Sequence, residues 1–524
     1  MDHPSDPSAA PSSGDPAPTL LCVWMVAFTG AGILYFLTMM PGLAWGDSGN
    51  AQLRVLLGHW YDHQYLVRSH VPYYIITSAL AASGLAPTIS ANVVSAAAGA
   101  ITVANVAVLL ALLTKRRTAI ACGATVLLFS HCLWHQATMA EVMTTSTMFM
   151  TSELVLLVLF LRRRRIGWLL TAMLLNGLHL AIHHLAALNW PAYLMVLFVI
   201  CNILPKPHVR WLAPGTILFL LGASPLLAVF YVGWQTHHDL ATVLAEMATG
   251  RFGPNVFNLS LNLAMVGRIV GYIGYSFPTP LLLLMPVGIL ALWRSQTRNE
   301  TVLILIPLIV HFLFAIRYNV PDQHAFMLHT FVFLAILMGL GVDRFLAKRQ
   351  SNAWRLAALV LPFTAPVLYT VVPDLIRSHA PNFEDLASRR LPYHDPYDWF
   401  LRPWRCGNRG PEAFAHEVLD ALPPNAVLAV DTAAVAPLVY IQVRDNLRRD
   451  IQIHPAEWYQ AWFDTPINLE SPAFTDAIRR GRVFTLTDRF APTSPLAGPQ
   501  FAFLTMGPVY RVAISPQFDT PTPD

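Results

Sequence analysis

The sequence predicts a mainly α-helical, polytopic membrane protein: a bundle of about eleven transmembrane helices, followed by a small C-terminal α/β domain. Three observations predict this class. Hydrophobic residues make up 55% of the 524 residues and charged residues only 12%, whereas a soluble domain carries about 25% charged residues. Apolar runs of the roughly 20 residues that span a bilayer recur between short polar breaks. These runs stop near residue 373, where charges and prolines return.

The apolar runs divide the chain into spans and outer segments. Residues 1–19 are rich in Pro, Ser and Asp, which predicts a disordered cytoplasmic tail, and they lack the basic region of a signal peptide. The membrane domain covers residues 20–372, with large outer segments at 41–90 and 234–271. We expect spans near residues 20–40, 91–114, 118–134, 140–161, 166–188, 189–204, 211–233, 272–293, 301–317, 325–346 and 354–372.

Each outer segment also contains an apolar stretch that is not expected to span. In the first, "VPYYIITSALAASGLAP" is too short to cross a bilayer comfortably and predicts an interfacial or re-entrant helix. In the second, "MVGRIVGYIGY" predicts a helix at the membrane surface.

The polar breaks alternate in basic content, which predicts the orientation. One set comprises "TKRRT", "RRRR", "KPHVR", "RSQTR" and "KRQSNAWR", and every lysine of the chain, Lys115, Lys206 and Lys348, falls in it. Positive residues in short loops stay in the cytoplasm. We therefore expect a cytoplasmic N-terminus, with the outer segments and the C-terminal domain in the periplasm or exterior.

Residues 373–524 have the pattern of a small soluble α/β domain. "GPEAFAHEVLDAL" has helical spacing, and four short apolar stretches predict buried strands. These are "NAVLAVD" (Asn425 to Asp431), "DIQIH" (Asp450 to His454), "GRVFTLTD" (Gly481 to Asp488) and "YRVAIS" (Tyr510 to Ser515). The five cysteines show no spacing typical of a disulfide framework. No basic face with interleaved aromatic residues is present, so nucleic acid is not an expected partner.

Acidic, imidazole and guanidinium groups from four chain segments share one predicted depth, the outer interface. Charged groups at membrane depth are costly, so each is a candidate functional residue. The candidates are Asp47, His70, Glu141, His183, His184, Arg317 and Asp322. Transfer from a lipid-anchored donor suits such a site. A guanidinium such as Arg317 or Arg268 can bind the lipid phosphate, and a carboxylate such as Asp47 can accept a proton from the acceptor hydroxyl.

Several candidates also have a purely structural interpretation. Asp47 in "GDSGN" is typical of a turn or of a helix N-cap. His183 and His184 can hydrogen-bond neighbouring helices. Arg317 can be an anchor at the membrane interface.

His59 and His63 raise the question of a metal. They stand four residues apart, a spacing that can hold a metal on a helix, but no Glu accompanies them in a His-Glu-x-x-His pattern, and a surface role is the other interpretation. No ligand spacing in the sequence demands a metal. We therefore predict no metal site and no certain cofactor, and a divalent metal stays open.

Several stretches resemble one protein family. "LAWGDSGNAQ", followed by "HVPYY", resembles the Asp-Ser-Gly-Glu and His-Pro-Pro-Gly pair of the transmembrane O-mannosyltransferase family, whose bacterial relatives were long described as a domain of unknown function. "MAEVMTTSTMFM", "NGLHLAIHHLAALNWPAY" and "RYNVPDQHAFMLHTFVFLAILMGLG" are similar to its Ala-Glu-Val-Tyr segment, its His-His helix and its Asn-x-x-Asp turn. "AVLAVDTAAVAPLVYIQVRDNLRRDIQI" is similar to the outer-domain pattern. The order matches over most of the chain. Asn50 stands in place of the family's glutamate, and Val71 and Tyr73 stand in place of Pro and Gly.

The resemblance implies a GT-C-like glycosyltransferase that moves mannose or a similar hexose from a polyprenyl-phosphate donor to an acceptor outside the cytoplasm. Such enzymes place the acceptor base in the first outer loop, which implies this role for Asp47. Glu141, His183, His184 and Asp322 match other polar positions of the family. The implied partners are the polyprenyl-phosphate-linked sugar, membrane lipid, and a protein, lipid or glycan acceptor.

Two other functions remain open. A transporter or flippase of a lipid-linked or polar substrate would favour polar residues spread through the bilayer midplane and related inverted halves. In this sequence the acids cluster at one predicted surface, and we detect no internal repeat. A membrane-anchored assembly or sensing protein would bind a partner through its outer domain and would not need Asp47.

Overall fold

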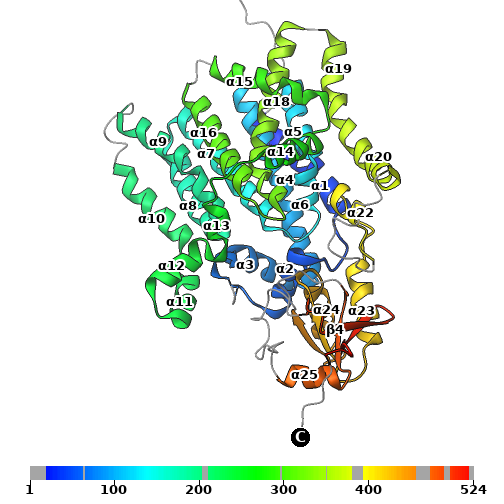
Figure 1. The fold of residues 1–524 in the computed structure, drawn as a ribbon. Coiled ribbons are helices and arrows are strands. Elements are labelled where there is room, and N and C mark those ends of the chain that lie inside the picture. The colour runs from blue at the N-terminus through cyan, green and yellow to red at the C-terminus, as the bar shows by residue number, and fades with distance from the viewer. Residues whose placement is uncertain are drawn as a thin grey trace, which may run out of the picture.

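The protein consists of a helical bundle at one end and a small C-terminal domain at the other, and the first outer segment lies between them (Figure 1). The structure is a computed structural model, in which the described residues are 19–62, 65–202, 210–294, 298–349, 351–379, 393–455, 472–488 and 496–518.

Seven helical segments of the described chain are long and apolar enough to cross a bilayer. They are α1 (Leu20–Thr38), α4 (Pro87–Leu113), α7 (Val142–Arg163), η2 with α9 (His184–Asn189 and Trp190–Asn202), α16 (Arg298–Arg317), α18 (Leu328–Lys348), and α19 through η6 to α20 (Asn352–Val360, Leu361–Phe363 and Thr364–His379). α8 (Ile166–Ile182) has 17 residues and is shorter. The chain is therefore a multi-pass membrane protein.

Three further predicted spans are bent helix pairs. They are α5 with α6 (Arg117–Leu128 and His131–Ala137), α10 with α11 (Leu212–Ala223 and Pro225–His237), and α14 with η5 and α15 (Leu263–Ser276, Pro280–Leu284 and Met285–Trp293), bent by 60°, 54° and 113°. Pro225 has no N–H to donate, and it begins the second helix of its pair. The predicted span at 272–293 is interrupted after Ser276, where Pro278 and Pro280 separate α14 from α15. α14 is instead the separate helix that "MVGRIVGYIGY" predicts.

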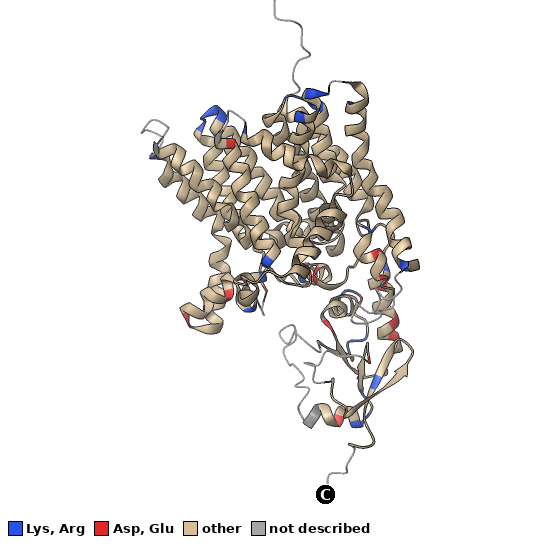
Figure 2. Ribbon diagram, turned by 45° about the horizontal axis from the view of Figure 1, so that its top comes forward, with Lys and Arg blue, Asp and Glu red and all other residues tan. Residues whose placement is uncertain are grey.

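Short helices form the outer segments. The first contains α2 (Gly46–Leu57), η1 (Leu66–Arg68) and α3 (Val71–Ala82), and α3 is the short apolar helix expected there. The second contains α12 (Leu240–Ala248), η4 (Gly250–Phe252) and α13 (Gly253–Val256), and α17 (Gln323–Phe326) lies between α16 and α18. Lys and Arg residues gather at the end of the bundle opposite the C-terminal domain (Figure 2). The cytoplasmic placement of that end stays a prediction.

The C-terminal domain is built on a five-stranded sheet with the strand order β2-β1-β3-β5-β4. β1 is parallel to β2 and β3, and β5 is antiparallel to β3 and β4. The elements are α22 (Pro396–Leu401), α23 (Gly410–Ala421), β1 (Val427–Val430), α24 (Thr432–Arg444), β2 (Gln452–Pro455), α25 (Pro472–Arg479), β3 (Val483–Thr485), β4 (Phe501–Met506) and β5 (Val509–Ile514). The four predicted strands and helix α23 are confirmed. The edge strand β4 was missed, because its residues are half-buried or exposed and show no buried alternation.

α2 joins the C-terminal domain to the bundle. It packs against α4 on one side and α24 on the other. Leu43, Trp45 and Leu53 belong to the same apolar core as Val435 and Val439 of α24. The two parts of the chain therefore share a core around the stretch that carries Asp47.

Candidate active site

The entry to α2 is fixed by buried amides. The backbone N–H of Ala44 donates to Gln52 Oε1 at 2.8 Å, and Gln52 Nε2 donates to Asn92 Oδ1 at 3.0 Å. Asn92 Nδ2 donates in turn to the Met40 carbonyl at 2.9 Å. These bonds attach the loop before α2 to helix α4, so the first turn of α2 has a defined position on the bundle.

Gly49 explains why small residues surround Asp47 in "GDSGN". A Cβ at Gly49 would lie 2.3 Å from the Ala44 carbonyl oxygen and 3.2 Å from Cβ of Ala436 in α24. Real Cβ atoms do not approach backbone that closely, so this position needs glycine. The close contact holds α2 against the C-terminal domain.

Asp47 lies in the first turn of α2 and faces solvent. Its side chain is 62% exposed, and Arg68 Nη2 donates to its Oδ1 at 2.7 Å. The N-cap of α2 is Trp45, without a side-chain cap bond, so Asp47 is not the N-cap. The Arg68 guanidinium lowers the pKa of Asp47. Asp47 is therefore an ionised carboxylate that an external molecule can reach.

Arg54 positions the segment that carries Arg68. Its guanidinium is 3% exposed and donates to the carbonyls of Arg68 and Ser69 at 3.0 and 3.1 Å. It also lies 3.8 Å from Asp62 and stacks 3.7 Å from the centre of the Tyr74 ring. A buried guanidinium with several acceptors fixes the loop geometry, which places Arg68 against Asp47.

Glu141 precedes α7 and faces α2. Ser48 Oγ donates to Glu141 Oε1 at 2.8 Å, and the Glu141 N–H donates to Ser95 Oγ at 2.8 Å. Burial raises the pKa of Glu141 to about 8, and the charges of Asp47 and Asp322 add to the rise. Ser48 was not among the predicted site residues.

Asp322 belongs to the same group of carboxylates. The residue is exposed at the surface. Desolvation by neighbouring protein groups and the charge of Asp47 nevertheless raise the pKa of its carboxyl to about 6. Asp47, Glu141 and Asp322 thus interact electrostatically although they come from distant parts of the chain. Carboxyl groups whose pKa values are driven apart are typical of acid and base partners in an active site.

His70, His183 and His184 lie on the side of this group that faces the bundle. His70 Nδ1 donates to the Ile182 carbonyl at 2.6 Å, and the His70 ring stacks on His183 with centroids 5.4 Å apart. Burial lowers the pKa of His70 to about 3, so its ring is neutral and its Nε2 is an acceptor. His183 Nδ1 accepts from the Leu185 N–H at 3.2 Å. His184 is half-buried and within electrostatic range of His70.

The two arginines expected to bind phosphate lie apart from these carboxylates. Arg317 donates to the Leu313 and Asn258 carbonyls, at 2.7 and 3.4 Å. Arg268 donates to Asn319 Oδ1 at 3.0 Å. Within the described ranges, neither guanidinium forms an ion pair with the candidate acids. The cation that the structure brings to Asp47 is Arg68, which sequence reasoning missed.

No group of three or more His, Cys, Asp or Glu side chains suited to a metal ion occurs among the described residues. His63 lies outside them, so neither the metal nor the surface interpretation of His59 and His63 is tested.

Comparison with solved structures identifies the fold. No family model matches the chain, and no curated protein does. ArnT from Cupriavidus metallidurans bound to undecaprenyl phosphate superimposes with a TM-score of 0.57 at 15% sequence identity, over 95% of this chain and 99% of ArnT. The apo state of the same protein gives a TM-score of 0.54 at 15% identity, over 93% and 97%. The chain has a GT-C fold.

The oligosaccharyltransferase of Archaeoglobus fulgidus, in complex with Zn and sulfate, is 11% identical over 95% of this chain and 74% of its own, with a TM-score of 0.48. The more specific likeness to O-mannosyltransferases is not confirmed. In this GT-C fold the group of Asp47, Arg68 and Glu141 lies where α2 joins the membrane helices to the C-terminal domain.

Proposed function

We propose that the protein is a glycosyltransferase that moves a sugar, mannose or a similar hexose, from a polyprenyl-phosphate donor to an acceptor on the periplasmic side of a bacterial inner membrane. The observation that carries the proposal is the exposed Asp47 carboxylate, paired with Arg68 beside Glu141, on a GT-C fold. ArnT, which shares this fold, is bound to undecaprenyl phosphate, and this supports a polyprenyl-linked donor.

Asp47 is the proposed general base. The acceptor hydroxyl oxygen attacks the anomeric carbon of the sugar, and its proton passes to the Asp47 carboxylate as the new glycosidic bond forms. The bond between the anomeric carbon and the phosphate oxygen breaks, and its electron pair leaves with the lipid phosphate. Attack on the face opposite the phosphate inverts the anomeric centre. Proton transfer from Asp47 to solvent restores the carboxylate.

In this proposal Arg68 and Glu141 donate hydrogen bonds to the leaving phosphate. Arg68 holds Asp47 ionised and can share its guanidinium with a phosphate oxygen, because a guanidinium has several donors. Glu141, with a pKa of about 8, is mostly protonated at neutral pH and can donate a hydrogen bond to the leaving phosphate. His70, His183, His184 and Asp322 shape the wall of the site. The second cation predicted for the phosphate, Arg317, is the weaker candidate because its guanidinium is bound to backbone carbonyls.

The proposal is tested with a panel of radiolabelled polyprenyl-phosphate sugars and cell-envelope extract as acceptor. Wild type should consume one donor and transfer its label to an extract component, whereas Asp47→Asn should not. Asp343→Asn is a matched control, because Asp343 also pairs with an arginine, Arg116, at 3.2 Å, outside the carboxylate group. Equal behaviour of wild type and Asp47→Asn would refute the role of Asp47.

One observation favours a second function, transport of a lipid-linked or polar substrate. Glu153 and His179 are fully buried inside the membrane-spanning bundle, where His179 Nδ1 donates to Glu153 Oε1 at 2.7 Å. Ionisable groups at that depth are typical of pumps and transporters. Movement of an intact labelled donor across a proteoliposome membrane, without transfer to acceptor, would support this function instead.

A further inference from the structure

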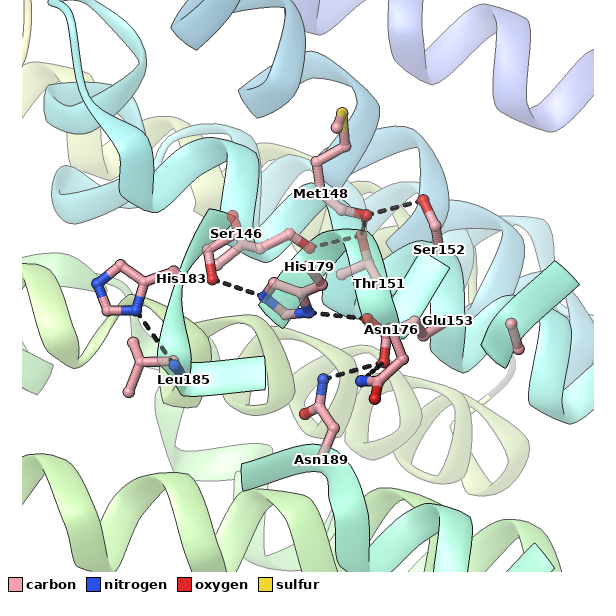
Figure 3. A network of polar contacts seen from close by, with 12 residues as sticks. Ser146, Met148, Thr151, Ser152, Glu153, Asn176, His179, His183, Leu185 and Asn189 are labelled. Atoms are coloured by element: carbon pink, nitrogen blue, oxygen red, sulfur yellow. Dashed lines mark hydrogen bonds and ion pairs between the residues drawn. The ribbon is translucent and has the colours of Figure 1, made fainter. Parts of the chain in front are cut away.

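A second polar cluster lies within the membrane-spanning helices. Its centre is Glu153 of α7, which is 1% exposed. Three side chains donate to its carboxylate: His179 Nδ1 at 2.7 Å, Asn176 Nδ2 at 2.9 Å and Asn189 Nδ2 at 3.3 Å (Figure 3). The Tyr193 hydroxyl lies at 3.1 Å. The carboxylate is thus surrounded by donors from α8, η2 and α9.

One arm of the cluster is a directional chain of hydrogen bonds. Ser146 Oγ lies 2.7 Å from His179 Nε2 and 2.8 Å from His329 Nε2. A carboxylate only accepts, so His179 carries its proton on Nδ1 and its Nε2 accepts from Ser146. Ser146 Oγ then accepts from His329 Nε2. The chain ends at His329 Nδ1, which is buried and has no hydrogen-bond partner among the described residues.

The other arm returns to the same carboxylate. His311 Nε2 donates to Asn189 Oδ1 at 2.9 Å, and Asn189 Nδ2 donates to Glu153. The rings of His311 and His329 stack with centroids 4.9 Å apart and planes 5° apart. We call the closed set of Glu153, His179, Ser146, His329, His311 and Asn189 the polar ring.

With all three histidines neutral, the polar ring would carry an uncompensated negative charge. Within the described chain, no Lys or Arg forms an ion pair with Glu153, and His179, which donates to it, is a cation only when it is doubly protonated. Glu300 is similarly buried, at 3% exposed, but Arg162 binds its carboxylate at 2.6 and 2.7 Å. An unpaired charge inside a membrane bundle is costly. Glu300 has such a positive partner in Arg162, whereas the polar ring needs one.

We propose that the polar ring is a proton-binding site, in which one proton taken up at His329 Nδ1 balances the charge of Glu153. That nitrogen can accept a proton without losing a hydrogen bond. Once the proton is bound, each proton along these hydrogen bonds can move to the next group. One moves from His329 Nε2 to Ser146, one from Ser146 to His179 Nε2, and one from His179 Nδ1 to Glu153. The shift leaves neutral groups throughout and conserves the number of protons.

Two further imidazoles, His183 and His70, lie near one another between the polar ring and Asp47. His183 lies within electrostatic range of His179 and His329, and it stacks on His70. His70 in turn interacts with Asp47. The remaining titratable group against the ring is Tyr193. The inference does not rest on glycosyl transfer.

The test measures protonation directly in the full-length protein in lipid nanodiscs. Nitrogen NMR of labelled histidines detects a histidinium, and infrared spectroscopy detects a protonated carboxyl group. Both are recorded at pH 9, above the pKa of about 8 of Glu141. The proposal expects one such proton, as histidinium or carboxylic acid, in wild type. It should disappear in Glu153→Gln and persist in the control Glu300→Gln.

Two results would overturn the proposal: no such proton in wild type, or the same signal in Glu153→Gln. If Glu153→Gln does not fold, the wild-type spectrum still decides whether the proton exists. His329→Gln then assigns it, because the glutamine amide can still donate to Ser146 but cannot take a proton. Persistence of the wild-type signal in His329→Gln, whether histidinium or carboxylic acid, contradicts uptake at His329, and its loss supports it.

Discussion

Asp47 and Glu153 are carboxylates of the same chain in opposite environments. Asp47 is largely exposed and has a guanidinium at 2.7 Å, whereas Glu153 is 1% exposed and is surrounded by neutral donors and imidazoles. The first is ionised and accessible, as a base that meets external substrates must be. The second is inaccessible, and the energetics of burial require its charge to be balanced locally. The partner of a carboxylate and its access to water, more than its depth alone, therefore indicate what it can do.

The largest expected effect is on the activity of the exposed carboxylate. Asp47→Asn keeps the size of the side chain but removes the proton acceptor, so the turnover number should fall by about 10²–10⁴-fold, the usual contribution of a general base. Donor affinity should change much less. Single-turnover rates over a range of donor concentrations would separate the two. A rise in KM with an unchanged turnover number would mean that Asp47 binds substrate without acting as the base.

Substitution of the buried carboxylate, Glu153, should instead have its largest effect on stability. Glu153→Ala leaves the donors of His179, Asn176 and Asn189 without an acceptor, and we expect a loss of about 3 kcal/mol in the free energy of unfolding. Asp47→Ala removes only a solvent-exposed ion pair and should cost less than about 1 kcal/mol. Denaturation of the two purified variants in the same detergent measures the difference. Equal losses would contradict the contrast drawn between the two environments.

Glu141 lies between these extremes and sets the expected pH dependence. Its protonated form is the one proposed to donate to the leaving phosphate, and its pKa is raised to about 8. The rate should therefore fall as the pH rises through about 8, when this proton is lost. Glu141→Gln keeps a donor that does not titrate, so the alkaline limb of the rate profile should flatten. An unchanged alkaline limb in Glu141→Gln would exclude this role.

The smallest effect is expected at Arg317. Its guanidinium binds the carbonyls of Leu313 and Asn258, so Arg317→Gln should change the rate of sugar transfer by less than about threefold, whereas loss of a guanidinium from a charged partner at the reacting centre costs much more. Arg68→Gln is the matched comparison. Initial rates across donor concentrations test both, and a larger loss at position 317 would restore Arg317 as the phosphate ligand.

Most of the fold followed from composition and hydropathy, because bilayer thickness sets the length of each apolar run. The bend angles did not: Pro278 and Pro280 mark the break between α14 and α15 in the sequence, but the 113° angle between them depends on how both helices pack in the bundle. β4 was missed because an edge strand needs no buried face.

The candidate site was predictable only in part. Asp47, Glu141 and Asp322 were expected at one depth, and the structure brings them within electrostatic range of one another. Arg68 was missed although "RSH" places it two residues before His70. Its contact with Asp47 depends on the loop that Arg54 fixes, which no local pattern reveals. Glu153 was not singled out, because its partners come from distant helices.

The most direct test of sugar transfer is the stoichiometry of the reaction in proteoliposomes. A donor labelled separately in its sugar and its polyprenyl phosphate is supplied with envelope acceptor, and both products are counted. Glycosyl transfer should release one polyprenyl phosphate for each sugar attached to acceptor, in wild type and not in Asp47→Asn. Donor that crosses the bilayer intact, with no polyprenyl phosphate released, would contradict glycosyl transfer and identify a transporter.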